Sequence, residues 1–188
     1  MFGLTSTEKY TPKPSSLLLE GYIREIAQGD TGSLALLYQQ TRHAVYGFAL
    51  SILKNPQDAE DVLQETYLRI HQAACGYHSN GKPMSWIFAI TRNLSLMKLR
   101  EHSKTTDLTD QQWAQLPAKA PSVTDEDRIL LQALMQLLTD QERQIVMLHT
   151  MSGLKHREIA QLLEIPLATV LSKYHRAIKK LKKHLEEG

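Results

Sequence analysis

Residues 55–68 read Asn-Pro-Gln-Asp-Ala-Glu-Asp-Val-Leu-Gln-Glu-Thr-Tyr-Leu and predict an amphipathic helix with a sharp start. Asn55 is a preferred N-cap and Pro56 a preferred first helical residue, because the first amides of a helix lack acceptors and proline has no amide to leave unpaired. Behind them, side chains suited to burial recur every three or four residues: Ala59, Val62, Leu63, Thr66, Tyr67 and Ile70. We therefore expect a helix that begins at Asn55 and buries this one stripe.

The same helix carries an acidic face. Asp58, Asp61 and Glu65 fall together outside the apolar stripe, and no Lys or Arg lies between Asn55 and Thr66 to neutralise them. Acids near a helix N-terminus also complement the helix macrodipole, which explains such a pattern without any partner. The alternative interpretation is a docking surface for another protein.

The charge of the chain is small in sum but uneven in placement. Its 188 residues carry a net charge of +2, with acids around residues 58–65 and bases from Lys173 to Lys183. Cys75 is the only cysteine, which excludes an internal disulfide and a cysteine-rich zinc site and fits a reducing cytosol. No run approaches the roughly 20 apolar residues of a membrane helix. We therefore expect a cytoplasmic protein that is not inserted in a membrane.

Helical periodicity without strand alternation predicts an all-α chain of two small helical domains joined by a linker. We expect residues 1–16 to form a flexible tail and residues 17–102 a first domain of four helices. The last of these should begin at Pro83 and run to about His102. Its inward side chains are expected to be Trp86, Ile90, Leu94 and Met97.

The second half of the chain predicts a linker followed by a smaller domain. Periodicity lapses over residues 103–123, and a helix start at Thr124 opens a domain that is expected to span residues 124–188. Thr139 and Glu142 form a capping box ahead of the next helix. The domain organisation is therefore tail, helical domain, linker and helical domain.

A helix-turn-helix is the clearest motif of the second domain. Residues 156–163 and 167–174 have helical patterns separated by the short turn Glu164-Ile165-Pro166. The second helix presents an outer strip that is hydroxylic first and cationic later: Thr169, Ser172, Lys173, Arg176, Lys180 and Lys183. Short donors at the start of such a helix reach base edges in the major groove, and later cations meet phosphates. The pattern predicts binding to duplex DNA.

Motifs for bond chemistry are absent from the sequence. It contains no HExxH, no Glu-x-x-His, no phosphate-binding glycine loop and no nucleophile elbow, so we expect neither an enzyme nor a metal or organic cofactor. One alternative is a helix-turn-helix regulator that binds duplex DNA without being a polymerase subunit. A receiver-type regulator is excluded, because residues 17–102 lack the alternating strands and helices that a receiver needs.

Residues 58–68 resemble the signature of region 2 of bacterial sigma factors, specifically the extracytoplasmic-function (ECF) group of the sigma-70 family. Residues 83–93 resemble the promoter-melting segment of that family, and residues 138–180 resemble its region 4. The resemblance implies a factor that binds core RNA polymerase, recognises the −35 and −10 promoter elements and promotes DNA melting. It also implies an anti-sigma factor as an inhibitory partner, and association with the nucleoid when the factor is bound to polymerase.

The resemblance assigns three sets of site residues. Those implied to bind the beta-prime clamp region of core RNA polymerase are Asp58, Glu60, Asp61, Gln64 and Glu65. Those implied to bind −10 DNA are Tyr77, His78, Asn80, Lys82, Trp86, Arg92 and Asn93. Those implied to bind −35 DNA are Arg157, Thr169, Leu171, Ser172, Lys173, Arg176 and Lys180. Lys98 and Arg100 are further candidates for phosphate contacts.

Several of these residues have ordinary structural interpretations. Trp86 shares a helix face with Ile90 and Met97, a pattern that favours core packing over DNA contact, and Asn80-Gly81 is a common turn pair. The chain also departs from the family pattern: Glu164 replaces a frequent turn glycine and Leu171 a frequent cation. The −35 sequence therefore cannot be carried over from relatives.

Overall fold

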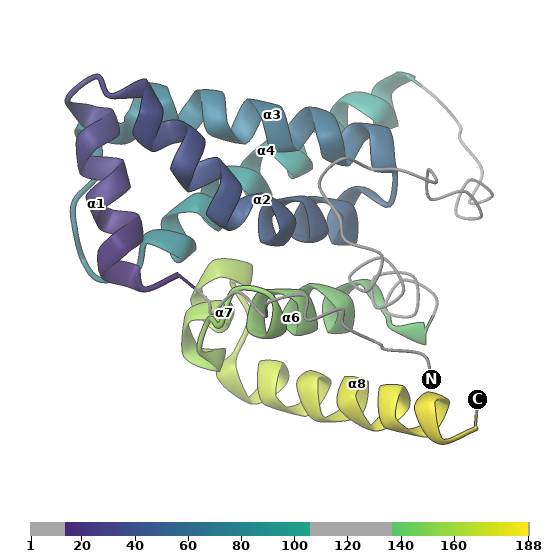
Figure 1. Ribbon diagram of the computed structural model, residues 1–188. Helices are drawn as coiled ribbons and strands as arrows, with labels where there is room; N and C mark the ends of the chain where they lie inside the picture. The colour runs from purple at the N-terminus through teal and green to yellow at the C-terminus, as the bar shows by residue number, and fades with distance from the viewer. Residues whose placement is uncertain (1–13, 106–136, 188) are drawn as a thin grey trace, which may run out of the picture.

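The computed structural model describes residues 14–105 and 137–187, and every regular element in those ranges is helical (Figure 1). The first range holds α1 (Ser16–Ala27), α2 (Thr31–Leu53), α3 (Pro56–Ala73), a short 3-10 helix (Ala74–Gly76) and α4 (Pro83–Thr105). The second range holds α6 (Asp140–Thr150), α7 (His156–Leu163) and α8 (Leu167–Glu187). The all-α fold predicted from the periodicity is confirmed.

Side-chain caps fix where the helices begin. The Asn55 carboxamide accepts the backbone N–H of Gln57 at 2.9 Å and that of Asp58 at 3.2 Å, so the helix start expected at Asn55 is confirmed. Asp30 caps α2 in the same way, accepting the backbone N–H of Gly32 at 2.8 Å. Each cap satisfies amides that have no partner inside the helix.

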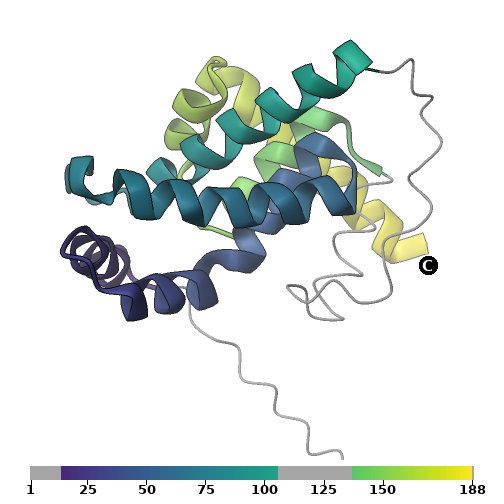
Figure 2. The ribbon, with the colours of Figure 1, turned by 90° about the horizontal axis from the view of Figure 1, so that it is seen from above.

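Helices α1 to α4 form one layer, in which α2 packs against α1, α3 and α4 (Figures 1 and 2). Residues 44–53 of α2 are buried on every side, because α3, α4 and α6 all pack against this helix. Edge-to-face aromatic pairs tie it to its neighbours: Phe48 lies 5.2 Å from Phe88 of α4, and Tyr38 lies 4.9 Å from Tyr67 of α3, measured between ring centroids.

Helices α6 to α8 form a second layer below the first, with α8 along its lower edge (Figure 1). Helix α6 packs against α2 and α7 packs against α4. Buried side chains of the second layer, among them Ile145, Leu148, Ile159 and Val170, belong to the same apolar cluster as the core of α1 to α4. The two helical units therefore share one core in this structure.

Some expectations differ from the structure, and others fall outside its described part. Helix α4 continues past His102 to Thr105. Met97, expected to point inward, is 46% exposed. Most of the predicted tail 1–16, most of the linker 103–123 and the helix start at Thr124 lie outside the described residues. None of the described helices combines the length and the apolar character that crossing a membrane requires.

Candidate protein and nucleic-acid interfaces

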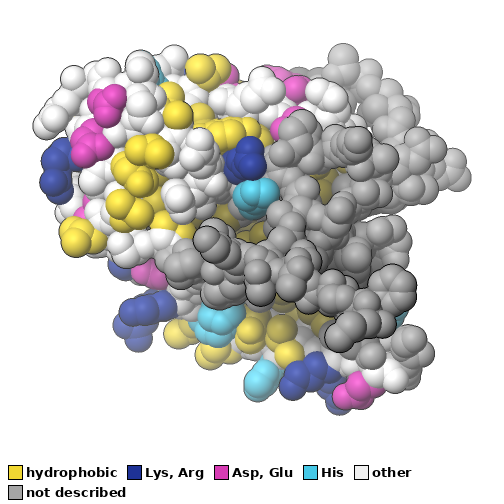
Figure 3. All heavy atoms as spheres, in the orientation of Figure 1, with side chains coloured by type: hydrophobic (Ala, Val, Ile, Leu, Met, Phe, Trp, Pro, Cys, Tyr) yellow, Lys and Arg dark blue, Asp and Glu magenta, His cyan; other side chains and the backbone are white. Residues whose placement is uncertain are grey.

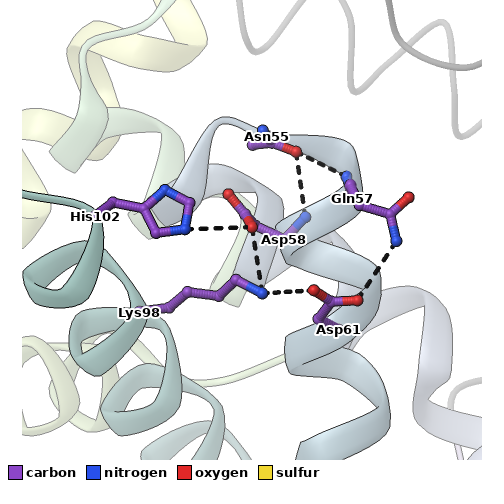
Figure 4. Close-up of polar contacts among 6 residues, drawn as sticks. All are labelled: Asn55, Gln57, Asp58, Asp61, Lys98 and His102. Carbon is purple, nitrogen blue, oxygen red and sulfur yellow. Dashed lines mark hydrogen bonds and ion pairs between the residues drawn. The ribbon is translucent and has the colours of Figure 1, made fainter. Parts of the chain in front are cut away.

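The acidic face of α3 meets a lysine from α4 (Figure 4). The Lys98 ammonium lies 3.2 Å from a carboxylate oxygen of Asp58 and 2.5 Å from one of Asp61. His102 Nε2 lies 3.7 Å from the same Asp58 oxygen. Asp58, expected on the outer face, is nearly buried with 13% of its side chain exposed, whereas half of the Asp61 side chain is exposed. The acidic face is thus partly neutralised by α4.

The pKa shifts in this cluster follow from those contacts. The hydrogen bond from Lys98 holds the pKa of the Asp61 carboxyl below its ordinary value. Burial alone would lower the pKa of the Lys98 ammonium, but hydrogen bonds to Asp61 and Asp58 outweigh it and raise that pKa. Both shifts favour the charged forms of Asp61 and Lys98. Lys98, expected to hold phosphates, is instead part of this cluster.

A groove of about 220 Å³ lies between α3 and α4 beside these charges. Its lining combines acids, one lysine and apolar side chains: Asp61, Val62, Glu65, Leu94, Met97, Lys98 and Glu101. On the α3 side Glu65 pairs with Arg69 at 2.8 Å, Gln64 is exposed and Glu60 is half-buried. An open groove lined by both acidic and apolar side chains suits a protein segment that presents basic and apolar side chains. We call it the acidic groove.

The loop of residues 77–82, between the 3-10 helix and α4, is held by a carboxylate from α1. Glu20 is buried, and one of its oxygens accepts the Tyr77 hydroxyl at 3.1 Å and the backbone N–H groups of Asn80 and Gly81 at 3.1 and 2.7 Å. The Asn80 carboxamide in turn accepts the backbone N–H of Lys82 at 3.0 Å. Sequence reasoning missed Glu20, since its partners are about sixty positions away along the chain.

The side chains of this loop divide between packing and exposure. The Tyr77 ring lies 4.8 Å from that of Trp86, and both are partly buried against the core. His78 and Asn80 are exposed. Trp86 is therefore largely a packing residue, as its helical spacing indicated, whereas His78 and Asn80 are open to a ligand.

The cations of the same surface face one carboxylate of α7 and one of the turn that follows it. The Lys82 ammonium lies 3.7 Å from Glu158, and the Arg92 guanidinium lies 3.7 Å from Glu164, whereas Asn93 next to Arg92 is exposed. These ion pairs could not be predicted from the sequence, because they join segments on either side of the predicted linker. In this arrangement α7 occupies the cationic groups that were predicted to meet DNA.

The predicted helix-turn-helix is present as α7, a short turn and α8. Its turn hinges on Glu164, which has the left-handed backbone φ of 58° and ψ of 41°. The backbone N–H of Ile165 donates to the Ala160 carbonyl at 3.1 Å and closes the turn. Val170 at the start of α8 is buried in the shared core. The two helices are thereby fixed relative to each other.

The outer strip of α8 is accessible for most of its length, and Figure 3 shows Lys and Arg side chains along this edge. Ser172 and Arg176 are exposed, as is Arg157 at the start of α7. Leu171 is 46% exposed, whereas Thr169 and Lys173 are half-buried. Hydroxyl, apolar and cationic side chains therefore follow one another along a helix surface that is accessible to solvent.

Lys180 differs from the other cations of the strip. Its ammonium lies 2.6 Å from Glu142, whose side chain is only 5% exposed. The same Glu142 oxygen accepts the backbone N–H and the hydroxyl of Thr139 at 3.1 and 3.0 Å, so the capping box at this helix start is confirmed. Burial alone would raise the pKa of Glu142, but the hydrogen bond from Lys180 and those from Thr139 outweigh it and lower that pKa. Lys180 joins α8 to the start of α6.

Two histidines, His149 and His156, stack on each other against Tyr174 of α8. The rings of His149 and His156 are 4.4 Å apart, and each meets the Tyr174 ring edge-on at 4.9 and 4.7 Å. His149 Nδ1 lies 2.9 Å from the Leu154 carbonyl. Burial, and then the charge of His149, lower the pKa of His156. In the described part of the chain no three His, Cys, Asp or Glu side chains gather into a group that could hold a metal ion.

Two family models match this chain one after the other along its sequence. The family model described as Sigma-70 region 2 matches residues 37–105, and the one described as Sigma-70, region 4 matches residues 128–181. The chain is 31% identical over 156 residues to the ECF RNA polymerase sigma factor SigM of Bacillus subtilis, covering 81% of this chain and 94% of that protein. It is 27% identical over 175 residues to the ECF RNA polymerase sigma factor SigK of Mycolicibacterium vanbaalenii, covering 89% of each.

A solved structure with the same fold is the sigma factor RpoE from Bartonella quintana, crystallised with the anti-sigma factor NepR. It matches with a TM-score of 0.60 at 24% identity, over 79% of this chain and 94% of that one. CnrH in complex with the cytosolic domain of CnrY matches with a TM-score of 0.59 at 19% identity, over 90% of this chain and 98% of that one. These structures share the two-layer helical fold.

Proposed function

Because the chain belongs to the ECF group of the sigma-70 family of RNA polymerase sigma factors, we propose that it docks on core polymerase through the acidic groove and reads promoter DNA with its two helical units. The observation that supports this most strongly is the presence of both family regions, in order, in one chain. As a polymerase subunit it would act in the cytoplasm, at the nucleoid.

The proposed docking site for the beta-prime clamp region is centred on the exposed acids of α3. Asp61, Gln64 and Glu65 remain accessible, and Asp61 and Glu65 line the groove together with the exposed Met97. Asp58 contributes indirectly, since it is nearly buried and holds Lys98. A partner with basic side chains would gain ion pairs at the rim and apolar contact at the floor.

Duplex recognition is proposed for α8, with the −35 element in contact with its outer strip. Ser172 and Leu171 stand at the start of the helix, where side chains reach base edges, and Arg176 follows where phosphates lie. The exposed loop residues His78 and Asn80 are then proposed to capture the opened −10 strand, with Lys82 and Arg92 on its phosphates.

The deciding experiment is run-off transcription from a pool of genomic promoter fragments, with purified core polymerase in the presence and absence of the protein. Promoter-specific transcripts that appear only with the protein support the proposal and define both elements. Tight duplex binding by the protein alone, with no transcripts, would instead indicate a conventional helix-turn-helix regulator.

Matched variants separate the two binding surfaces. Lys173→Ala and Arg176→Ala should weaken upstream-promoter binding and leave core-polymerase binding intact, whereas Asp61→Asn with Glu65→Gln should do the reverse. Lys182→Ala on α8 and Glu186→Gln at its end are the charge-matched controls, since neither belongs to a proposed surface. Loss of core binding in the α8 variants would contradict the assignment.

We also propose an anti-sigma factor as the inhibitory partner. The related structure of the Bartonella quintana sigma factor was solved with such a protein bound. A tagged copy of this chain, purified from its native host under non-inducing conditions, should carry a stoichiometric inhibitor. Recovery of core polymerase alone under every condition would argue against one.

A further inference from the structure

The loop of residues 77–82 has no helix or strand of its own, yet its backbone is fixed. Its amides at Asn80 and Gly81 converge on a single Glu20 oxygen, and the Tyr77 hydroxyl donates to the same oxygen. A side-chain hydrogen bond from Ser79 reaches the same carboxylate. One buried side chain thus collects donors from both ends of the loop and from its tip.

The electrostatics suit a permanent anchor. The hydrogen bond from Ser79, followed by that from Gly81, holds the pKa of Glu20 below its ordinary value. Burial, together with its hydrogen bond to Glu20, raises the pKa of the Tyr77 hydroxyl to about 12. The acceptor therefore stays ionised and the donor stays protonated across the physiological range, so the contact does not switch with pH.

The anchor leaves the His78 and Asn80 side chains exposed, with the Asn80 carboxamide oxygen held by the Lys82 backbone N–H. Glu20 is 8% exposed and directs its oxygen into the loop, so it is not itself available to a ligand. Gly81 has a φ of +73°, a left-handed value that suits glycine, and the adjacent Asn80 side chain is exposed. The position of the Asn80 carboxamide is therefore set by the backbone that Glu20 holds.

We propose that Glu20 is a positioning residue for base selection: it fixes the loop of residues 77–82 so that His78 and Asn80 present one geometry to an unpaired base of the −10 element. This inference rests on the proposed strand capture. A base turned out of the stack is read by hydrogen bonds at defined positions, so a loosened loop loses discrimination between bases before it loses contact with the backbone.

The test uses the full chain assembled with core polymerase and fork-junction promoter DNA. Each of the four bases is placed in turn at every non-template position of the −10 element, and the dissociation constant is measured for each. Wild-type protein should prefer one base strongly at one or two positions. Glu20→Ala should reduce that preference by roughly tenfold, the loss of one well-formed polar contact. Glu20→Gln keeps an acceptor oxygen without the charge and should fall between them.

Glu25→Ala is the matched control, because Glu25 lies on the same helix and contacts Ser33 of α2, away from the loop. It should keep the wild-type base preference. Core binding and −35 duplex binding should be unchanged in all variants. Equal weakening for all four bases, or an unchanged preference in Glu20→Ala, would overturn the proposal and leave Glu20 a stabilising residue only.

A second measurement needs neither polymerase nor DNA. In Glu20→Ala and Glu20→Gln, the amides of Asn80 and Gly81 should exchange hydrogen faster than in wild type, whereas amides in the middle of α2 keep their protection. Unchanged exchange at both amides would refute the anchor itself. If exchange responds but wild-type holoenzyme shows no base preference at any position, the proposed strand capture fails instead, and the base-selection role fails with it.

Discussion

At the scale of single residues, Glu164 has a strained backbone, because its φ of 58° lies in the left-handed region. A left-handed conformation costs a non-glycine residue about 1–2 kcal/mol. Its ion pair with Arg92 spans 3.7 Å, and 78% of the Glu164 side chain is exposed, so this pair contributes well under 1 kcal/mol. The free-energy cost of the left-handed backbone therefore exceeds the gain from the ion pair. The turn of the helix-turn-helix would be more stable with a residue that adopts this conformation without strain.

Glu164→Gly should therefore stabilise the protein by about 0.5–1 kcal/mol, the strain relieved less the extra backbone entropy of glycine in the unfolded chain. Urea unfolding measures the change. Glu164→Ala is the control, because it removes the same ion pair but keeps the strained φ. Equal stabilisation by both variants would show that charge, not backbone strain, is responsible.

The lowered pKa of His156 predicts that the folded protein loses stability in acid. Its pKa in the folded protein is lowered from 6.5, so the unfolded chain binds more protons below that pH. Stability is thus retained above pH 6.5 and lost as the pH falls below it, which lowers the melting temperature in acid.

Thermal melts at constant ionic strength between pH 7 and 5.5 should show this slope. His156→Phe should reduce it, since phenylalanine keeps an aromatic ring against both His149 and Tyr174. His175→Phe, at an exposed position of α8, should leave the slope unchanged. An identical slope in wild type and His156→Phe would mean that other groups cause the acid sensitivity.

At the scale of helices, α8 carries two kinds of lysine. Lys180 compensates the buried Glu142, whereas no carboxylate among the described residues forms an ion pair with Lys173. Lys180→Ala should cost about 1–3 kcal/mol, because a nearly buried carboxylate loses its charged partner. Lys173→Ala should change stability by less than about 0.5 kcal/mol and act on DNA binding instead. Urea unfolding and fluorescence-detected duplex binding, run on both variants, separate the two roles; a larger loss of stability in Lys173→Ala would reverse the assignment.

The helices show how far the sequence can predict a structure. The start of α3 at Asn55, the capping box of α6 and the helix-turn-helix were predictable, because each signal lies within a few residues along the chain. Lys98 and Glu20 were not, because the partners of Lys98 belong to another helix and those of Glu20 to a loop about sixty positions away. One helical period does not say which neighbour a side chain will meet. Met97 was predicted to be buried from its spacing, but it is 46% exposed and lines the acidic groove between α3 and α4.

At the scale of the whole molecule, the helix-turn-helix unit covers part of the surface that was predicted to capture the −10 strand. Lys82 and Arg92 face Glu158 and Glu164, and α6 packs against α2. The proposed strand capture places these two cations on phosphates, so the carboxylates of Glu158 and Glu164 would compete with the DNA for them.

Glu158→Lys combined with Glu164→Lys should therefore shift the free protein toward separated units. The repulsion is exposed, so the effect should be partial, largest at low salt and diminished above about 0.15 M. Small-angle scattering or energy transfer between dyes on α1 and α8 measures it. Adding Lys82→Glu and Arg92→Glu restores opposite charges and should restore the compact form. No expansion at low salt would mean that the apolar contacts alone hold the units together.

The burial of α2 on every side also bears on how the protein is made. Residues 44–53 leave the ribosome long before α6, which packs against them in the finished molecule. Until that last segment is synthesised, the growing chain exposes an apolar strip on α2, the kind of surface that associates with other chains or recruits chaperones. Fragments that end before residue 137 keep that strip permanently, so they should aggregate at concentrations that the full-length chain tolerates.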